Sequence, residues 1–161
     1  MGPSMNANPG TLGIDYFIAH PSFRTYALCA AILGLKMLFS AIYTGVQRQR
    51  HQGYINAEDA HTFGQSGARA GAEESPAVAH ALRIQRNDLE NIPLFFAIGL
   101  VYVLTGASPL GAVAYCWTFT IARILHTIAY TWNLQPWRAI FYGIGTLALL
   151  GMIVHIILVT L

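Results

Sequence analysis

Residues 83–91 combine the groups of a binding or catalytic site with the spacing of a helix. Four of their side chains recur at i, i+3, i+4 and i+7 and therefore share one helix face: Arg83, Arg86, Asn87 and Glu90. Asp88 points away from this face. Ionisable groups at or near bilayer depth cost about 2.5–3.5 kcal/mol each on insertion scales, so a membrane helix that keeps them together is expected to use them. The face predicts a site, and the alternative is a salt-bridge network that only holds helices together.

Two later segments repeat this arrangement of polar groups on a helix face. One set is Arg123, His126 and Tyr130, at i, i+3 and i+7, and the other is Arg138 and Tyr142, at i and i+4. All three sets are expected at the same end of the molecule, where they can converge on one cavity. Three further residues are expected near its mouth: Arg48, Arg50 and Asp59. Alternatively, His126 is a packed core histidine, Arg123 pairs with Glu90, and Arg48 and Arg50 anchor the helix at the headgroups.

The chemistry that such a cavity favours is the binding of a small polyanion. Guanidinium groups stay charged and bind carboxylates in bidentate geometry. Neighbouring Arg side chains also lower the pKa of a bound thiol, and the thiolate is the reactive form. Glutathione matches these groups because it carries two carboxylates, an ammonium and a thiol. No Cys or His set has metal-ligand spacing and no Ser nucleophile with a His base is evident, so we expect no metal and no nucleic-acid partner.

The composition indicates the elements that hold these residues. The chain is 55% hydrophobic and 10% charged, whereas soluble domains have ~25% charged residues. A spanning helix needs ~20 mostly apolar residues, and four stretches qualify: 26–46, 76–104, 110–130 and 137–161. The sequence therefore predicts an all-α integral membrane protein, an up-down bundle of four transmembrane helices.

The connections divide the chain and set its orientation. We expect an N-terminal segment at 1–22, with a cloning scar ahead of native Met5, and a four-helix domain at 23–161 with a long loop at about 47–75. The loop has a helix-start signal at 56–59, Gly106 suits a left-handed helix end, and Pro109 and Pro136 suit helix starts. One side of the bundle holds most of the arginines: Arg48, Arg50, Arg69, Arg83 and Arg138, against Arg24 on the other. The positive-inside rule then places the loop and the site on the cytoplasmic side.

Three sets of residues are expected to serve packing. Cys29 and Cys116 lie in apolar spans and are interpreted as reduced, packed thiols. Lys36 is the charge in the middle of the first span, so a structural Lys36–Asp88 pair is as plausible as a ligand role for Asp88. Three glycines of the last span are expected to allow close helix packing: Gly143, Gly145 and Gly151.

Several motifs also resemble those of the MAPEG family, the membrane-associated proteins of eicosanoid and glutathione metabolism. The segment 83–92, RIQRNDLENI, followed by 95–102, resembles the signature second helix of that family. Residues 56–59, 122–130 and 135–139 resemble its loop, its third helix and the start of its fourth, and Lys36 has a counterpart there. The similarity covers about residue 26 to the C-terminus. It is closest to the microsomal glutathione transferase and prostaglandin E synthase subgroup.

The resemblance implies a homotrimer with glutathione bound between neighbouring four-helix subunits. The family's glutathione contacts fall on Arg48, Arg83, Arg86, Asn87, Glu90, His126, Tyr130, Arg138 and Tyr142. Arg138 would stabilise the thiolate. The chain has Gln85 where the family usually has His and Ala57 where it has Pro.

The first functional hypothesis is a membrane glutathione transferase that conjugates the thiolate to hydrophobic electrophiles and also reduces lipid hydroperoxides. The second is a glutathione-dependent prostaglandin E synthase-type isomerase. The synthase pattern has a Ser directly after the thiolate-binding Arg, and Ala139 at this position weakens a mechanism that needs the hydroxyl. The third is a non-catalytic lipid-binding scaffold, ranked last because that branch is not expected to keep the whole Arg, Asn and Glu face. The implied partners are glutathione, an apolar electrophile or lipid, membrane lipid and further copies of the chain.

Overall fold

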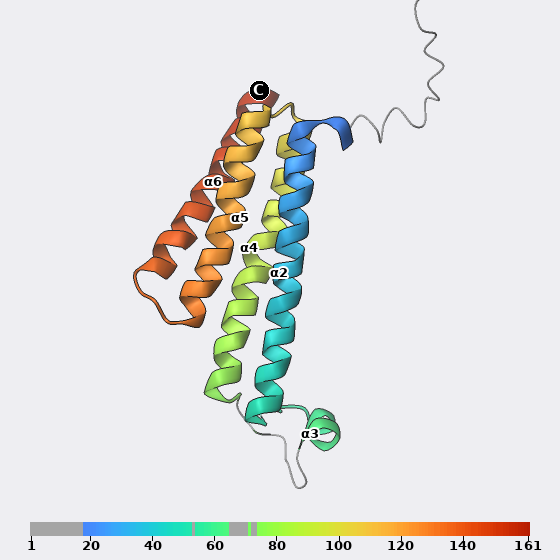
Figure 1. The fold of residues 1–161 in the computed structure, drawn as a ribbon, viewed down its shortest axis with the longest axis vertical. Coiled ribbons are helices and arrows are strands. Elements are labelled where there is room, and N and C mark those ends of the chain that lie inside the picture. Colours follow the sequence, from blue (N-terminus) through green and yellow to red (C-terminus); the bar gives the residue numbers. More distant parts are fainter. Residues whose placement is uncertain (1–17, 53, 65–70, 72–73) are drawn as a thin grey trace, which may run out of the picture.

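The computed structural model describes residues 18–52, 54–64, 71 and 74–161, and in this part of the chain every regular element is a helix. The long helices are α2 (Pro21–His51), α4 (Pro76–Leu104), α5 (Pro109–Thr131) and α6 (Trp137–Thr160), and the short helix is α3 (Ala57–Phe63). The long helices alternate in direction and form an up-down bundle (Figure 1). All four are long and apolar enough to cross a membrane. The predicted all-α, four-span architecture is confirmed.

Local signals explain why the helices begin and end where they do. The Ser75 hydroxyl accepts a hydrogen bond from the Val78 N–H, and the Ser108 hydroxyl accepts one from the Gly111 N–H. A proline follows each cap at the first helical position. Gly106 has a φ of 85°, a left-handed conformation that suits glycine and turns the chain between α4 and α5. The helix end predicted at Gly106 and the helix start predicted at Pro109 are confirmed.

Helix α2 is longer than the predicted span of residues 26–46. It continues through Arg48 and Arg50 and ends at His51, and the next residue, Gln52, caps it with a φ of 48°. The predicted boundary was wrong because hydropathy marks where apolar residues stop, whereas a helix can continue into water. The expected helix start at 56–59 is confirmed, since α3 follows Asn56. Arg69, which supported the predicted orientation, lies outside the described residues.

The helices pack as two pairs, α2 with α4 and α5 with α6, and α2 also packs on α5. Helix α6 also contacts α4, so α2 and α6 occupy opposite corners of the bundle. At the end that carries α3, α2 and α4 extend past the α5–α6 turn (Figure 1). Helices α5 and α6 therefore cover the beginning of α4 only close to the α5–α6 connection.

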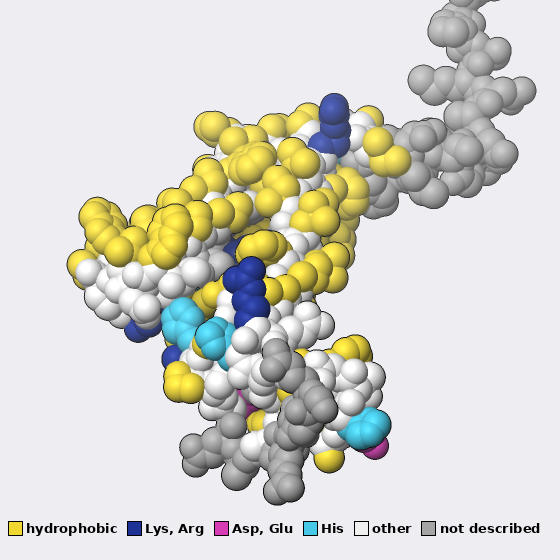
Figure 2. Space-filling view, turned by 60° about the horizontal axis from the view of Figure 1, so that its bottom comes forward, with side chains coloured by type: hydrophobic (Ala, Val, Ile, Leu, Met, Phe, Trp, Pro, Cys, Tyr) yellow, Lys and Arg dark blue, Asp and Glu magenta, His cyan; other side chains and the backbone are white. Residues whose placement is uncertain are grey.

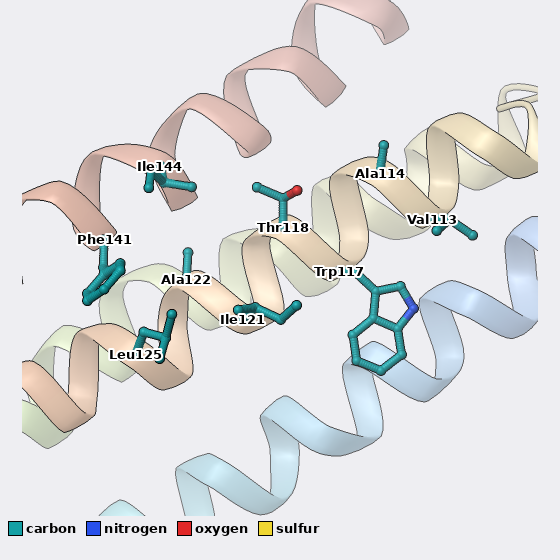
Figure 3. Close-up of a pocket in the computed structure, with 9 residues that line it drawn as sticks. All are labelled: Val113, Ala114, Trp117, Thr118, Ile121, Ala122, Leu125, Phe141 and Ile144. Atoms are coloured by element: carbon teal, nitrogen blue, oxygen red, sulfur yellow. The ribbon is translucent and has the colours of Figure 1, made fainter.

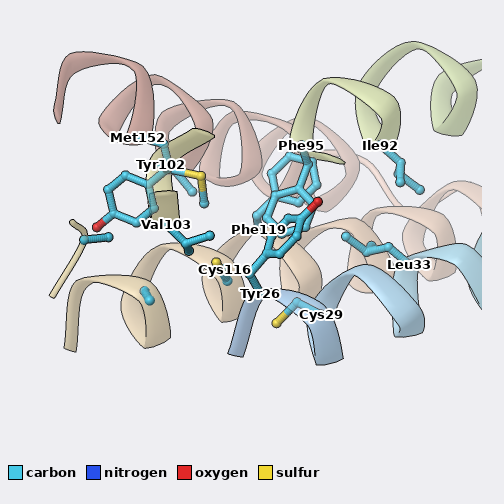
Figure 4. Packing of buried hydrophobic residues seen from close by; sticks show 13 residues of the cluster. Tyr26, Cys29, Leu33, Ile92, Phe95, Tyr102, Val103, Cys116, Phe119 and Met152 are labelled. Atoms are coloured by element: carbon cyan, nitrogen blue, oxygen red, sulfur yellow. The ribbon is translucent and has the colours of Figure 1, made fainter. Parts of the chain in front are cut away.

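The half of the bundle near the C-terminus has an apolar core (Figure 4). Phe95 of α4 stacks on Phe119 of α5, with ring centroids 4.7 Å apart, and Tyr26 of α2 packs on Phe95. Cys29 and Cys116 are fully buried in this cluster as free thiols, which confirms their predicted packing role. The cluster residues described in this half pack together without a charged side chain among them.

The other half of the bundle holds buried charge. Lys36 of α2 forms an ion pair with Asp88 of α4, whose side chain is 2% exposed. The Ser40 hydroxyl donates a hydrogen bond to the second carboxylate oxygen of Asp88. The predicted Lys36–Asp88 pair is confirmed. Because the two charges neutralise each other, neither is needed to explain ligand binding.

The glycines of α6 differ in their surroundings. A Cβ on Gly151 would lie 2.4 Å from the Tyr115 ring, and one on Gly145 would lie 3.2 Å from the Arg123 Nε atom. The prediction of close packing is confirmed at these two positions. It is wrong for Gly143 within this chain, because no described atom lies within 4 Å of the corresponding Cβ.

Candidate functional site

Arg123 of α5 is the most deeply buried cation of the candidate site, with 1% of its surface exposed. Its guanidinium donates hydrogen bonds to two amide oxygens of α4, Asn87 Oδ1 at 3.3 Å and Asn91 Oδ1 at 3.0 Å. Its Cζ atom also lies 5.1 Å from the ring centroid of Tyr142. Neutral amides hold this charge, so the pairing considered between Arg123 and Glu90 is not the one that forms. The Arg123 charge stays uncompensated by these contacts.

An aromatic and cationic cluster lies where α5 ends and α6 begins. The His126 ring is 5.8 Å from the Tyr130 ring and 6.1 Å from the Tyr142 ring, and it is 4% exposed. The Arg138 guanidinium lies over the Tyr130 ring, with Cζ 4.5 Å from its centroid. The two sets predicted on α5 and α6 therefore converge, and Arg123 joins them to α4.

His80 is a member of this cluster that the sequence analysis missed. Its ring lies 5.4 Å from the Tyr130 ring, and its Nε2 atom is buried with no hydrogen-bond partner among the described residues. The signal was present, because His80 is three positions before Arg83 and so extends the polar face by one turn. Asn91, four positions after Asn87, extends the same face in the other direction.

The predicted face of α4 divides between the inside and the outside of the bundle. Asn87 is half-buried and bonds Arg123, whereas Arg83, Arg86 and Glu90 are exposed. An open pocket of about 510 Å³ lies along the exposed side, and its polar lining residues are Glu74, Arg83, Gln85 and Arg86. In a single chain these outward arginines are not in the cluster around Tyr130.

Arg48 lies at the loop end of α2 and donates a hydrogen bond to Glu74 Oε1 at 3.2 Å. The contacts of the described residues do not join it to Tyr130 or Arg138. Arg50 is exposed on the same turn. Asp59 accepts a hydrogen bond from Asn56 within the α3 region, so one chain leaves Arg48 and Asp59 apart from the cluster.

An apolar pocket of about 360 Å³ lies on the outer side of α5 and α6. Figure 3 shows that Trp117, Ile121 and Leu125 of α5 and Phe141 and Ile144 of α6 project around it. Two of its lining residues are sequence neighbours of the polar site, Ala122 beside Arg123 and Phe141 beside Tyr142. An apolar surface and a cationic site thus share the same segments.

Charge imbalance decides what the polar site can bind. Two cations are neutralised by ion pairs, Lys36 by Asp88 and Arg48 by Glu74. The charged side chains of the predicted site that have no ion-pair partner among the described residues are Arg83, Arg86, Arg123 and Arg138, with Glu90 as the one anion. In the space-filling view, Lys or Arg and His side chains lie beside one another between the apolar surface of the long helices and α3 (Figure 2). Such an excess of guanidinium groups attracts carboxylates and stabilises a thiolate. Among the residues of the described ranges, no three His, Cys, Asp or Glu side chains gather to hold a metal ion.

The fold and this site define a multi-pass helical membrane protein with a cationic, aromatic-lined site at one end of its bundle. The sequence profile of the MAPEG family matches residues 26–158, and the chain belongs to this family. Prostaglandin E synthase of Macaca fascicularis and that of Homo sapiens are each 33% identical to it over 141 residues, which cover 87% of this chain and 91% of the relative. Microsomal glutathione S-transferase 1 of Homo sapiens is 37% identical over 125 residues, which cover 76% of this chain and 81% of the relative.

Proposed function

We propose that this protein is a membrane glutathione transferase, which joins the glutathione thiolate to hydrophobic electrophiles and also reduces lipid hydroperoxides. The observation that supports this most strongly is the excess of guanidinium groups around Tyr130 and along α4. Two carboxylates and a thiolate on one small ligand would neutralise most of that charge. A relative that is 37% identical is named as a glutathione S-transferase.

Each residue of the site has a proposed role. Arg138, held over the Tyr130 ring, stabilises the thiolate and is the catalytic residue. Arg123 holds the Asn87 side chain in place by a hydrogen bond and adds positive potential at the site. The remaining contacts orient the tripeptide, and they are Arg48, Arg83, Arg86, Asn87, Glu90, His126, Tyr130 and Tyr142.

The location of the site suits one water-soluble and one lipid-soluble reactant. Apolar electrophiles partition into the bilayer, and the apolar pocket of α5 and α6 lies next to the polar site. Glutathione would arrive from the cytosol, which agrees with a cytoplasmic orientation of the long loop and of the site. The exposed Trp132 and Trp137 flank the α5–α6 turn at a position that suits the membrane interface.

We propose that the protein is a homotrimer whose subunits meet at the exposed face of α4. Glu90 is exposed near the middle of α4, two positions from the apolar run that starts at Ile92, and Arg86 is exposed one turn earlier. Charges at that depth are costly when they face lipid, so a neighbouring copy of the chain is the expected cover. Glutathione bound at this boundary would bring Arg48 of one copy to the cluster of the next.

Light scattering of the detergent-solubilised protein, corrected for detergent, is expected to give three times the chain mass of 17.6 kDa. The physical reason is that a single copy leaves Arg86 and Glu90 facing lipid. The variant for comparison is Glu90→Leu, which makes this face more apolar by removing one of the two charges that would face lipid. A stable monomer of the unmodified protein would contradict the proposed assembly.

Glutathione is expected to bind saturably and to be held as the thiolate at neutral pH. An ordinary thiol has a pKa of about 8.5 and is mostly protonated at pH 7, whereas Arg138 and its neighbours favour the anion. The thiolate absorbs near ~240 nm, so titration of the purified protein measures binding directly. S-methylglutathione, which has no thiol, is the control and should bind without the absorbance. Absence of both absorbance and calorimetric binding would favour a lipid-binding scaffold.

A second candidate is a prostaglandin E synthase-type isomerase. Similarity to prostaglandin E synthases over 91% of their length favours it. Ala139, which follows Arg138, lacks the hydroxyl that one form of that reaction would use. A product assay with a prostaglandin endoperoxide and, separately, a chlorinated aromatic electrophile distinguishes the two activities.

A further inference from the structure

We propose that His80 is a ligand-binding residue of the glutathione site, and that its Nε2–H donates a hydrogen bond to a carboxylate of the bound tripeptide. The inference rests on the proposed function and adds a contact that neither the motifs nor the residue faces of the sequence assign. His80 lies in the first turns of α4, three positions before Arg83. It is thus at the loop end of the bundle, where a water-soluble ligand would enter.

The position of His80 ties it to the group proposed to hold the thiolate. Its ring lies 5.4 Å from the Tyr130 ring, and Arg138 Cζ lies 4.5 Å from the centroid of the same ring. The Tyr130 ring therefore contacts His80 of α4 and Arg138 of α6. The proposal places the ligand against the Tyr130 ring, where it would meet both His80 and Arg138.

The described part of the chain does not provide a hydrogen-bond partner for the Nε2 atom of His80. Its Nε2 atom is buried, and none of the residues in the described ranges offers it a hydrogen bond. A buried polar atom without a partner costs about 1–3 kcal/mol, so such atoms usually have a functional reason. Arg138, over the same Tyr130 ring, attracts an anion to this place, and an imidazole N–H is a suitable additional donor to a carboxylate.

A second histidine shows that an orphaned nitrogen does not by itself make a site. The His155 ring packs 4.9 Å from the Tyr102 ring, and its Nε2 atom is also buried without a partner among the described residues. His155 lies near the end of α6, in the apolar half of the bundle. What distinguishes His80 is its place among the arginines and tyrosines of the candidate site. His155 is therefore the matched control.

The test compares glutathione binding by the full-length, detergent-solubilised protein and by three variants. His80→Phe keeps an aromatic ring on Tyr130 but removes Nε2, and it should raise the glutathione Kd and KM at least about tenfold, as expected for a lost hydrogen bond to a charged group. The kcat at saturating glutathione should stay within about twofold because Arg138 is intact. His80→Gln, which can place an amide N–H near the position of Nε2, should restore most of the affinity. His155→Phe should bind like the unmodified protein.

Two outcomes would overturn the inference. An unchanged Kd in His80→Phe means that the nitrogen does not touch the ligand. A larger loss in the Gln variant than in the Phe variant means that His80 only supports Tyr130 by packing its ring there. If His80→Phe does not fold, as judged by its melting curve and size, His80→Leu replaces it with the same expected loss. Failure of the unmodified protein to bind glutathione at all contradicts the proposed function itself, which separates the two conclusions.

Discussion

Replacing Arg138 with Leu is expected to lower kcat/KM for a chlorinated aromatic electrophile by at least ~100-fold. The Arg138 guanidinium lies over Tyr130 and is the group that would stabilise the thiolate. Removing one such electrostatic donor from an active site typically costs ~10²–10³ in rate. The measurement is steady-state conjugation at saturating glutathione, together with the thiolate absorbance, which should be lost in the same variant.

Two comparisons separate a catalytic role of Arg138 from a general effect of charge. Arg50→Leu also removes one positive charge, but Arg50 is exposed at the loop end of α2, so activity should stay within about twofold. Arg138→Lys keeps the charge but loses the planar fork and should recover activity only in part. Melting curves of all variants should coincide. Full activity of Arg138→Leu would end its assignment as the catalytic residue.

Replacing Asp88 with Asn is expected to cause the largest loss of stability of any single change considered. It leaves the Lys36 ammonium without its counter-charge where the Lys36 side chain is only 9% exposed. Breaking one partner of a buried ion pair costs about 3–5 kcal/mol. The thermal midpoint in detergent should therefore fall by many degrees, and the yield of folded protein should fall with it.

The double replacement Lys36→Met with Asp88→Leu should recover most of that stability. Replacing a whole buried pair by apolar groups of similar volume is often neutral or stabilising. The Ser40 hydroxyl then loses its acceptor on Asp88, but it can donate instead to the carbonyl oxygen of residue 36, which already lies 3.1 Å away. A double variant as unstable as the Asn variant would show that the pair has a role beyond neutralising charge. Transferase activity near normal in the double variant would confirm that the pair is structural.

Much of the fold could be predicted from the sequence because its signals are local. Pro76 and Pro109 at helix starts, Gly106 at a helix end and ~20-residue apolar runs fix the helices in a bilayer. The error at α2 has a physical cause, since lipid sets where apolar residues are needed and not where helical hydrogen bonds stop. The same local logic predicted the helix start at Asn56.

The candidate site was predicted less completely because partners across helices are not encoded by spacing. Periodicity separated Asp88 from the face of Arg83 and Glu90, and the structure buries Asp88 against Lys36 as expected. It did not show which neighbour Arg123 would bond, because Asn87, Glu90 and Asn91 are all within about one turn of the same helix. The two amides are the ones that bond it. The spacing of His80 from Arg83 placed it on the same polar face, but only the structure shows that its ring meets Tyr130.

The buried pair of Lys36 and Asp88 also has a consequence for biosynthesis. The two residues are 52 positions apart, so at 5–20 residues per second Lys36 is made roughly 3–10 s before its partner. During that interval α2 is otherwise apolar enough to enter the bilayer but carries an uncompensated ammonium. The nascent first helix gains its counter-charge only when α4 emerges from the ribosome. We therefore expect α2 to be held less firmly in the bilayer until α4 has been made, and the 52 residues between the two charges set the length of that delay.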